Sequence, residues 1–210
     1  MNKTKVVSFD VDGTLVDRKF VDIIWDEAVP ELYAKEKGIG LEEAKEYIKK
    51  EYDKVGDKKV EWYDIKYWFK HFGINKNWKE LLMEFKNEIE IYPDVMNILD
   101  ELSKKYKLII ISNASKEFLD IEVEKFKHYF AYIFSSTSDF KQLKKTANFY
   151  FSICSILGVK PHEIVHVGDN WDFDFIAPRK IGIKTFYLDR IGQKQGDSVI
   201  HDLMELKYKL

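Results

Sequence analysis

The stretch Val6-Val7-Ser8-Phe9-Asp10-Val11-Asp12-Gly13-Thr14 brings a β-branched and aromatic run to an end at two carboxylates and a glycine. Residues i and i+2 of an extended segment point the same way, so we expect Asp10 and Asp12 to face one ligand. Gly13 allows an abrupt turn that lets a substrate approach. Because two carboxylates repel a phosphate dianion, phosphoryl chemistry here requires a cation, and Mg²⁺ is suited to carboxylate, carbonyl and water oxygens. Asp and Gly are also common in solvated turns, so the stretch alone leaves both interpretations open.

The composition is that of a globular protein. The 210 residues suffice for one sizeable core with an insertion or for two small domains, and 45% of them are hydrophobic. A formal net charge of −2, with both signs mixed along the chain, provides no basic stripe, so no nucleic-acid partner is expected. Met1 to Lys5 lead directly into a strand, and no window is apolar enough to span a membrane. We therefore expect a cytoplasmic protein without a membrane partner, in which the single cysteine, Cys154, is a small buried side chain.

Residues 20 to 90 have helical periodicity and almost no strand signal. The aromatic and aliphatic residues Trp62, Ile65, Trp68 and Phe69, for example, recur at the spacing of one helix face. The expected helices cover 20–37 with a kink at Pro30, 41–54, 61–71 and 77–90. This segment is therefore predicted to be an all-helical insertion.

From residue 92 onward, strands and helices alternate. The expected strands cover 107–111, 131–135, 164–167 and 184–188. The expected helices cover 94–105, 116–126, 146–157, 172–180 and 197–208. This alternation predicts an α/β fold with a parallel sheet covered on both faces, whose ligands bind beyond the carboxyl ends of the strands.

Small polar or acidic residues follow two of these strands. Ser112 and Asn113 come directly after 107–111, where a hydroxyl and backbone N–H groups can hold phosphate oxygens. Ser115, two residues further on, is instead expected to cap helix 116–126. The acids Asp169 and Asp174 follow strand 164–167, at the same predicted edge.

In their order, these segments resemble the motifs of the haloacid dehalogenase (HAD) superfamily. Asp10 to Thr14 match its first motif, Asp-x-Asp-Gly-Thr, and Ser112 matches the second. Asp169, after Gly168, and Asp174 match the fourth. The family's usual spacing of the third-motif lysine from the end of its helix and from the fourth motif selects Lys144, with the adjacent Lys145 as the alternative.

The resemblance implies a Rossmann-like parallel sheet flanked by helices, built from residues 1–16 and 93–210, with residues 17–92 inserted as an all-helical cap domain. It implies that Asp10, the backbone carbonyl of Asp12, and Asp169 hold Mg²⁺. Asp174 would orient the lysine or a metal-bound water. Asp10 would be the nucleophile and Asp12 the general acid and base. The groups implied to bind the transferring phosphoryl group are Ser112, Asn113 and Lys144.

The function implied by this resemblance is Mg²⁺-dependent hydrolysis of a small phosphorylated metabolite through an aspartyl-phosphate intermediate. A 2-haloacid dehalogenase is one alternative, but that branch generally lacks the second acid, here Asp12. A sugar-phosphate mutase is another, since mutases use the same acids and differ in how closure excludes water. A protein-binding module formed by the aromatic residues of the insertion is a third, although core packing is the commoner role of such residues. The oligomeric state is left open.

Overall fold

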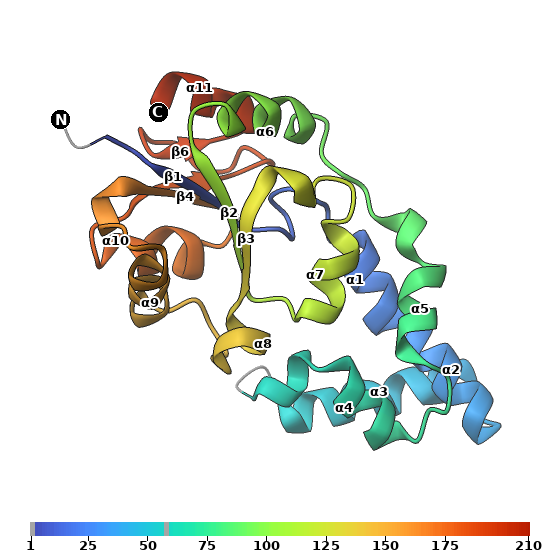
Figure 1. Ribbon diagram of the computed structural model, residues 1–210. Helices are drawn as coiled ribbons and strands as arrows, with labels where there is room; N and C mark the ends of the chain where they lie inside the picture. The colour runs from blue at the N-terminus through green and yellow to red at the C-terminus, as the bar shows by residue number, and fades with distance from the viewer. Residues whose placement is uncertain (1–2, 57–58) are drawn as a thin grey trace.

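The computed structural model describes residues 3–56 and 59–210, and its described strands form one six-stranded parallel sheet in the order β3-β2-β1-β4-β5-β6 (Figure 1). Residues 1–2 and 57–58, which belong to the expected units 1–16 and 17–92, lie outside the described residues. The strands are β1 (Val6–Phe9), β2 (Lys107–Ser112), β3 (Phe130–Ser135), β4 (Ile164–Gly168), β5 (Lys184–Leu188) and β6 (Val199–Ile200). The Rossmann-like parallel sheet predicted from the sequence is confirmed.

Strand β1 lies inside the sheet, between β2 and β4. All four of its residues are buried, as expected for a short apolar strand that is covered on both faces. Phe9 is in register with Ile110 of β2 and with Val167 of β4, so the three strands end within two residues of the same level. Because the chain proceeds in opposite directions across the sheet from β1, this level is where a ligand crevice is expected.

Helices cover both faces of the sheet. Side chains that alternate along β2 separate into two apolar clusters: Leu108 and Ile110 belong to one, Ile109 and Ile111 to the other. The first cluster includes residues of α6 (Val95–Ser103), α7 (Lys116–Glu122) and α11 (Leu206–Lys209). The second includes residues of α9 (Ala147–Leu157) and α10 (Ala177–Arg179). A short helix, α8 (Ser136–Phe140), follows β3.

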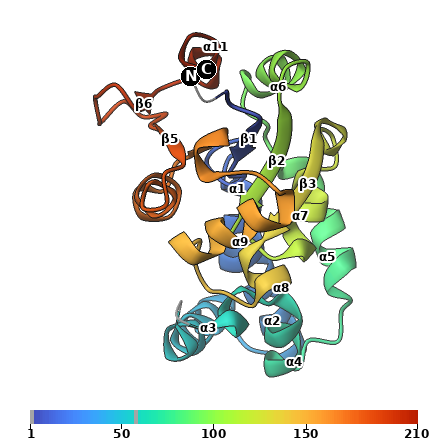
Figure 2. The same ribbon diagram turned by 60° about the vertical axis from the view of Figure 1, so that its left-hand side comes forward.

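The described elements between β1 and α6 are all helical, as predicted. They are α1 (Lys19–Ile23), a π-helical segment (Ile24–Ala28), α2 (Val29–Lys37), α3 (Leu41–Val55), α4 (Ile65–Phe72) and α5 (Trp78–Glu84), with 3₁₀ turns at Val60–Tyr63 and Lys86–Glu88. The two segments that connect the insertion to the sheet lie side by side. Asp17 N donates to Glu90 O at 3.0 Å, and Tyr92 N donates to Leu15 O at 3.1 Å. Helices α2, α3 and α4 lie beyond the carboxyl ends of the strands (Figures 1 and 2).

The C-terminal segment differs from the expectation. Residues 197–208 were predicted to be one helix, but Val199 and Ile200 form β6 beside Tyr187 and Leu188 of β5, and helix resumes only near Leu203. Val199 and Ile200 pair with the backbone of β5 at the sheet edge. Periodicity along the sequence carries no information about such a pairing. No helix within residues 3–56 and 59–210 is both long enough and apolar enough to cross a membrane.

Candidate active site

A buried ion-pair cluster lies at the carboxyl end of β1. The Lys145 Nζ atom is 2.6 Å from Asp10 Oδ1 and 2.5 Å from Asp174 Oδ1, and it also donates to the Ile111 carbonyl at 3.3 Å. Lys145 is 1% exposed, Asp10 7% and Asp174 0%. Three segments far apart in the sequence therefore bring opposite charges together, out of water, where their attraction is strong.

The structure corrects the choice of lysine. The expected residue was Lys144, yet the ammonium beside Asp10 belongs to Lys145, whereas Lys144 Nζ lies 5.2 Å from the ring centroid of Phe173. Lys144 lies in a bend of the chain, and the two adjacent lysines have different neighbours. Thr146 caps α9 through a bond from Phe149 N, and this cap places Lys145 immediately before the helix.

The charges in the cluster do not balance. Burial raises the pKa of Asp10 well above its ordinary value, opposed by Lys145, and burial together with Asp174 raises the pKa of Asp169 to about 6. Burial also works against ionisation of Asp174, but Lys145 and His166 prevail and lower its pKa to about 2. Three acids share one ammonium here, and an additional cation would stabilise their ionised forms.

The cluster fits a divalent metal ion. One carboxylate oxygen from each of Asp10, Asp169 and Asp174 lies within 4.8 Å of the others. Gly13 has φ +76°, and a Cβ placed on it would come within 2.2 Å of Asp169 Oδ2, so the loop after β1 can approach Asp169 only with glycine at this position. Hard carboxylate oxygens suit Mg²⁺. The Asp12 carboxylate, by contrast, is not a member of this group.

Asp174 has partners besides the lysine. Its Oδ1 lies 3.0 Å from His166 Nε2, and its Oδ2 accepts a bond from Asn170 N at 3.1 Å. His166 is fully buried in β4, its Nδ1 lies 2.7 Å from Ser8 Oγ, and burial lowers its pKa, which favours the neutral ring. Since both Asp174 oxygens are engaged by protein groups, Asp10 and Asp169 are the acids of the cluster better placed to take a metal.

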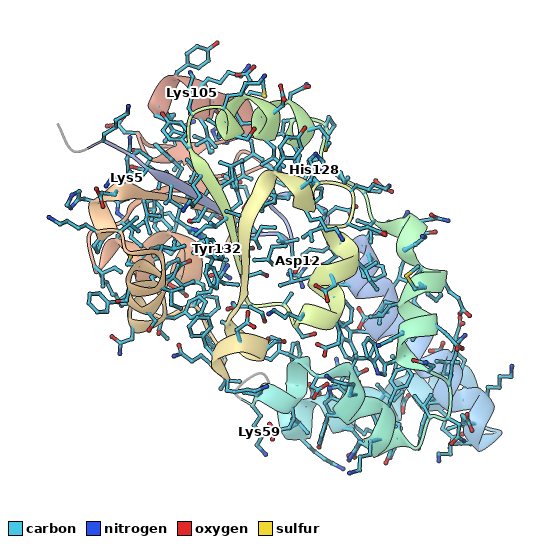
Figure 3. The ribbon with its side chains drawn as sticks, viewed as in Figure 1. Lys5, Asp12, Lys59, Lys105, His128 and Tyr132 are labelled. Atoms are coloured by element: carbon cyan, nitrogen blue, oxygen red, sulfur yellow. The ribbon has the colours of Figure 1, made fainter. Side chains whose placement is uncertain are left out.

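Asp12 has a different neighbour from Asp10. Its charge acts on the carboxyl of Glu122, a residue of α7 that is 2% exposed and whose two carboxyl oxygens have no hydrogen-bond partner within the described residues. Burial raises the pKa of Asp12, and burial and the Asp12 charge raise that of Glu122 well above its ordinary value. Two carboxyl groups that repel each other in a buried place favour a proton on one of them. Figure 3 labels Asp12 between the sheet and the inserted helices.

Ser112 is the last residue of β2 and Asn113 follows it, at the carboxyl edge of the sheet. Ser112 is 1% exposed, and its Oγ accepts a bond from Ala114 N at 3.1 Å. Asn113 Oδ1 accepts from Ser136 Oγ of α8 at 2.9 Å, so the amide orientation is set by a neighbouring helix. Ser115 occupies the N-cap position of α7, but its side chain makes no capping hydrogen bond, so the expected side-chain cap is wrong.

A pocket of about 480 Å³ opens from this edge toward the inserted helices. Asp12 and Asn113 line its inner end. Trp25, Tyr52 and Trp62 line its outer part. The expected catalytic edge and the helical insertion therefore share one cavity.

Comparison with known proteins identifies the family. A model of haloacid dehalogenase-like hydrolases matches residues 4–182, which is most of the chain. The chain belongs to this family. The resemblance drawn from the ordered motifs is thereby confirmed.

Relatives of this hydrolase include proteins with two kinds of described activity. This chain is 25% identical over 166 residues to the GMP/IMP nucleotidase YrfG of Escherichia coli K12, and the match covers 78% of this chain and 73% of that protein. It is 29% identical over 144 residues to (S)-2-haloacid dehalogenase 4A of Burkholderia cepacia, covering 67% and 59% respectively. The crystal structure of a HAD phosphatase from Thermococcus onnurineus matches with TM-score 0.84 and 25% identity, over 98% of this chain and 97% of that one.

Sequence reasoning about this hydrolase missed several residues of the site. Glu122, Tyr150 and His166 lie outside the quoted motifs, and only His166 carried a usable signal. It is a polar residue in an apolar strand, in register with the polar Ser8 of β1. Tyr150 of α9 lies 3.0 Å from His166 Nε2 through its hydroxyl, a contact that depends on how the helix packs on the sheet.

Proposed function

We propose that this hydrolase is a Mg²⁺-dependent phosphatase that acts on a small phosphorylated metabolite. The observation that carries the proposal is the arrangement of Asp10 against the buried ammonium of Lys145, with a second acid, Asp12, two residues further on. A nucleophile and an acid with separate neighbours suit the two halves of covalent phosphoryl transfer. The nucleotidase and phosphatase relatives support this reaction class.

In the first half-reaction, a carboxylate oxygen of Asp10 attacks phosphorus, the bond from phosphorus to the ester oxygen breaks, and an aspartyl-phosphate forms. Asp12 gives its proton to the leaving alkoxide. Burial raises the pKa of Asp12, which favours the protonated acid that this step needs. Lys145 and the polar groups of Ser112 and Asn113 stabilise the charge on the phosphoryl oxygens.

In the second half-reaction, water attacks the phosphorus of the aspartyl-phosphate. Asp12, now ionised, takes the proton from that water, and the bond between Asp10 and phosphorus breaks to release phosphate and restore the carboxylate. Asp174 keeps Lys145 in place throughout, because its Oδ1 contacts the ammonium at 2.5 Å. One carboxyl therefore serves as acid and then as base.

Asp10, Asp169 and the backbone carbonyl of Asp12 would hold Mg²⁺, which when bound supplies positive charge to the transferring phosphoryl group. The inserted segment 17–92 would act as a cap, since its aromatic residues line the pocket that opens from Asp12. Two short segments, 15–17 and 90–92, connect the insertion to the sheet, and bending at these segments would let the insertion move relative to the sheet.

The test is hydrolysis of p-nitrophenyl phosphate by the wild type and by Asp10→Asn, with and without Mg²⁺. Asp10→Asn should lower kcat by about 10³-fold or more, as expected for loss of a nucleophile. Circular dichroism should show that the variant remains folded. Turnover by Asp10→Asn at the wild-type rate would refute the mechanism.

The dehalogenase relative makes a second measurement necessary. Chloride release from 2-chloropropionate in the absence of Mg²⁺ reports ester formation at carbon, which needs no acid for the leaving halide. We expect none, because the partly buried acids Asp12 and Asp169 have no role in that reaction. Chloride release without phosphatase activity would assign the chain to the dehalogenase reaction instead.

A further inference from the structure

The outer part of the pocket has an unusual distribution of charge. Beyond Asp12, it is lined by the carboxylates of Asp22 and Asp26 and by one guanidinium, that of Arg18. Arg18 Nη2 lies 3.9 Å from Asp22 Oδ1, so part of its charge is already offset. A leaving group with a second phosphate or a carboxylate would meet net negative charge here, whereas one with N–H donors would find acceptors.

The pocket also presents aromatic surface that is held in place before any ligand binds. Trp25 stacks on Phe118 with ring centroids 5.5 Å apart and an interplanar angle of 27°, and its ring meets that of Tyr52 edge to face at 5.8 Å. Trp62 comes from a separate 3₁₀ turn of the insertion. Rings fixed by packing offer stacking area with little loss of side-chain entropy on binding.

One polar group in the aromatic part has no hydrogen-bond partner among the residues that the structure describes. The Tyr52 hydroxyl is buried, and no hydrogen-bond partner for it lies within the described residues. Burial raises the pKa of Tyr52, and the nearby charge of Asp26 adds to that effect. A buried hydroxyl without a partner is costly, so a polar atom of a ligand is a natural partner for it.

We propose that this pocket binds the base of a nucleoside 5′-monophosphate, with the phosphate at Asp10 and the base against the aromatic rings near Tyr52 and Asp26. The inference rests on the proposed phosphatase function and adds the substrate class. A planar base uses the ring faces, its N–H groups donate to the carboxylate of Asp26, and its ring nitrogen or carbonyl accepts from the Tyr52 hydroxyl. A simple sugar phosphate has no planar ring system to stack on the aromatic side chains.

Comparison of guanosine 5′-monophosphate with ribose 5-phosphate isolates the base, because the two share the phosphate and the sugar. We expect kcat/KM for the nucleotide to exceed that for ribose 5-phosphate by about 10- to 100-fold, the range that stacking of one base supplies. Adenosine and uridine monophosphates would rank the bases. Phosphocholine tests a cationic leaving group, and we expect it to be a poorer substrate than the nucleotides.

Variants should remove this preference. Tyr52→Phe deletes the hydroxyl and keeps the ring, and Trp25→Leu deletes an aromatic face. Each should reduce the ratio of the two kcat/KM values at least several-fold. Trp78→Leu, which changes a tryptophan of the insertion that does not line the pocket, is the matched control and should leave the ratio unchanged.

Binding to Asp10→Asn, measured by calorimetry, separates the two proposals. Tighter binding of guanosine 5′-monophosphate than of ribose 5-phosphate, without hydrolysis of any phosphate ester by the wild type, would overturn the phosphatase and leave the pocket assignment standing. Hydrolysis of ribose 5-phosphate or phosphocholine at least as efficiently as the nucleotides would overturn the pocket assignment. Equal binding of the two ligands would do the same.

Discussion

The carboxyl edge of the sheet and the inserted helices line two sides of one pocket, and they differ in how their buried polar groups are paired. At the sheet edge, Asp10, Lys145 and Asp174 are buried and in direct contact, so each charge is held by another. In the insertion, the Tyr52 hydroxyl is buried without a partner within the described residues, and the surrounding groups are mostly rings. The charged groups Asp10, Lys145 and Asp174 of the first region contact one another, whereas the Tyr52 hydroxyl of the second has no such partner within the described residues.

The difference indicates where chemistry and selectivity reside. A network of short charge contacts tolerates few substitutions, since removal of one charged side chain leaves the other charged groups buried without a partner. An aromatic pocket tolerates substitution, and a change there alters which leaving group fits. We therefore expect changes at the sheet edge to affect every substrate and changes in the pocket to affect the ranking of substrates.

The largest effect should come from Lys145→Met. Loss of the ammonium leaves Asp10 and Asp174 buried without their cation, and breaking such a pair costs about 3–5 kcal/mol of unfolding free energy. Phosphatase activity should fall together with the unfolding free energy. Lys144→Met, the matched control, removes a contact with the Phe173 ring that is worth about 0.5–1 kcal/mol. Urea unfolding and phosphatase assays of both variants test this, and equal losses would mean that Lys145 is not the essential ammonium.

In the insertion, Trp68→Ala should be the most destabilising change. Trp68 is 0% exposed, and its Nε1 donates to the Trp62 carbonyl at 3.1 Å. Truncation of a buried tryptophan costs about 3–5 kcal/mol through lost contacts and the cavity that remains. Trp78→Ala, at a partly exposed tryptophan, should cost much less. Thermal unfolding of the two variants gives the comparison, and similar losses would contradict the buried role of Trp68.

Mg²⁺ should stabilise the protein through the sheet edge alone. At a concentration about 100 times its Kd, a ligand of the folded state adds about 2.7 kcal/mol to the unfolding free energy. Differential scanning fluorimetry should show a higher Tm with Mg²⁺ for the wild type and no shift for Asp169→Asn. Asp172→Asn, at an exposed acid three residues further along the chain, should respond like the wild type. A full shift in Asp169→Asn would remove Asp169 from the metal site.

The smallest effect concerns Glu122, the buried neighbour of Asp12. Burial raises its pKa in the folded protein, so the folded state binds more protons than the unfolded chain. The stability linked to this group is therefore fully present below about pH 4.3, the ordinary pKa of Glu, and is lost as pH rises toward the folded-state pKa. Glu122→Gln should gain stability relative to the wild type between pH 5 and 8, with the gain increasing with pH.

Thermal unfolding of Glu122→Gln across this pH range measures the effect. Glu124→Gln, at an exposed carboxyl two residues along the chain, serves as the control and should follow the wild type. A difference between Glu122→Gln and the wild type that does not change with pH would mean that the Glu122 carboxyl is not held protonated by its surroundings.

Most of the sheet could be predicted because its strands are short apolar runs that end in polar residues. The continuous run before Asp10 and the run 107–111 before Ser112 were sufficient to place both ends at one edge. β6 could not be found in this way. Val199 and Ile200 form a strand only because β5 offers unpaired backbone groups beside them, and no local pattern of two residues reports that.

By itself, the sequence determined the α/β architecture, the helical insertion and the edge at which Asp10, Asp12, Ser112 and Asp169 would be found, since periodicity and strand ends are local properties. The choice between Lys144 and Lys145, and the position of the Glu122 carboxyl near Asp12, became clear only from the folded arrangement. Those contacts join residues more than a hundred positions apart. Which side chain faces which depends on the rotation and packing of whole helices against the sheet, and that packing is settled by the entire core at once.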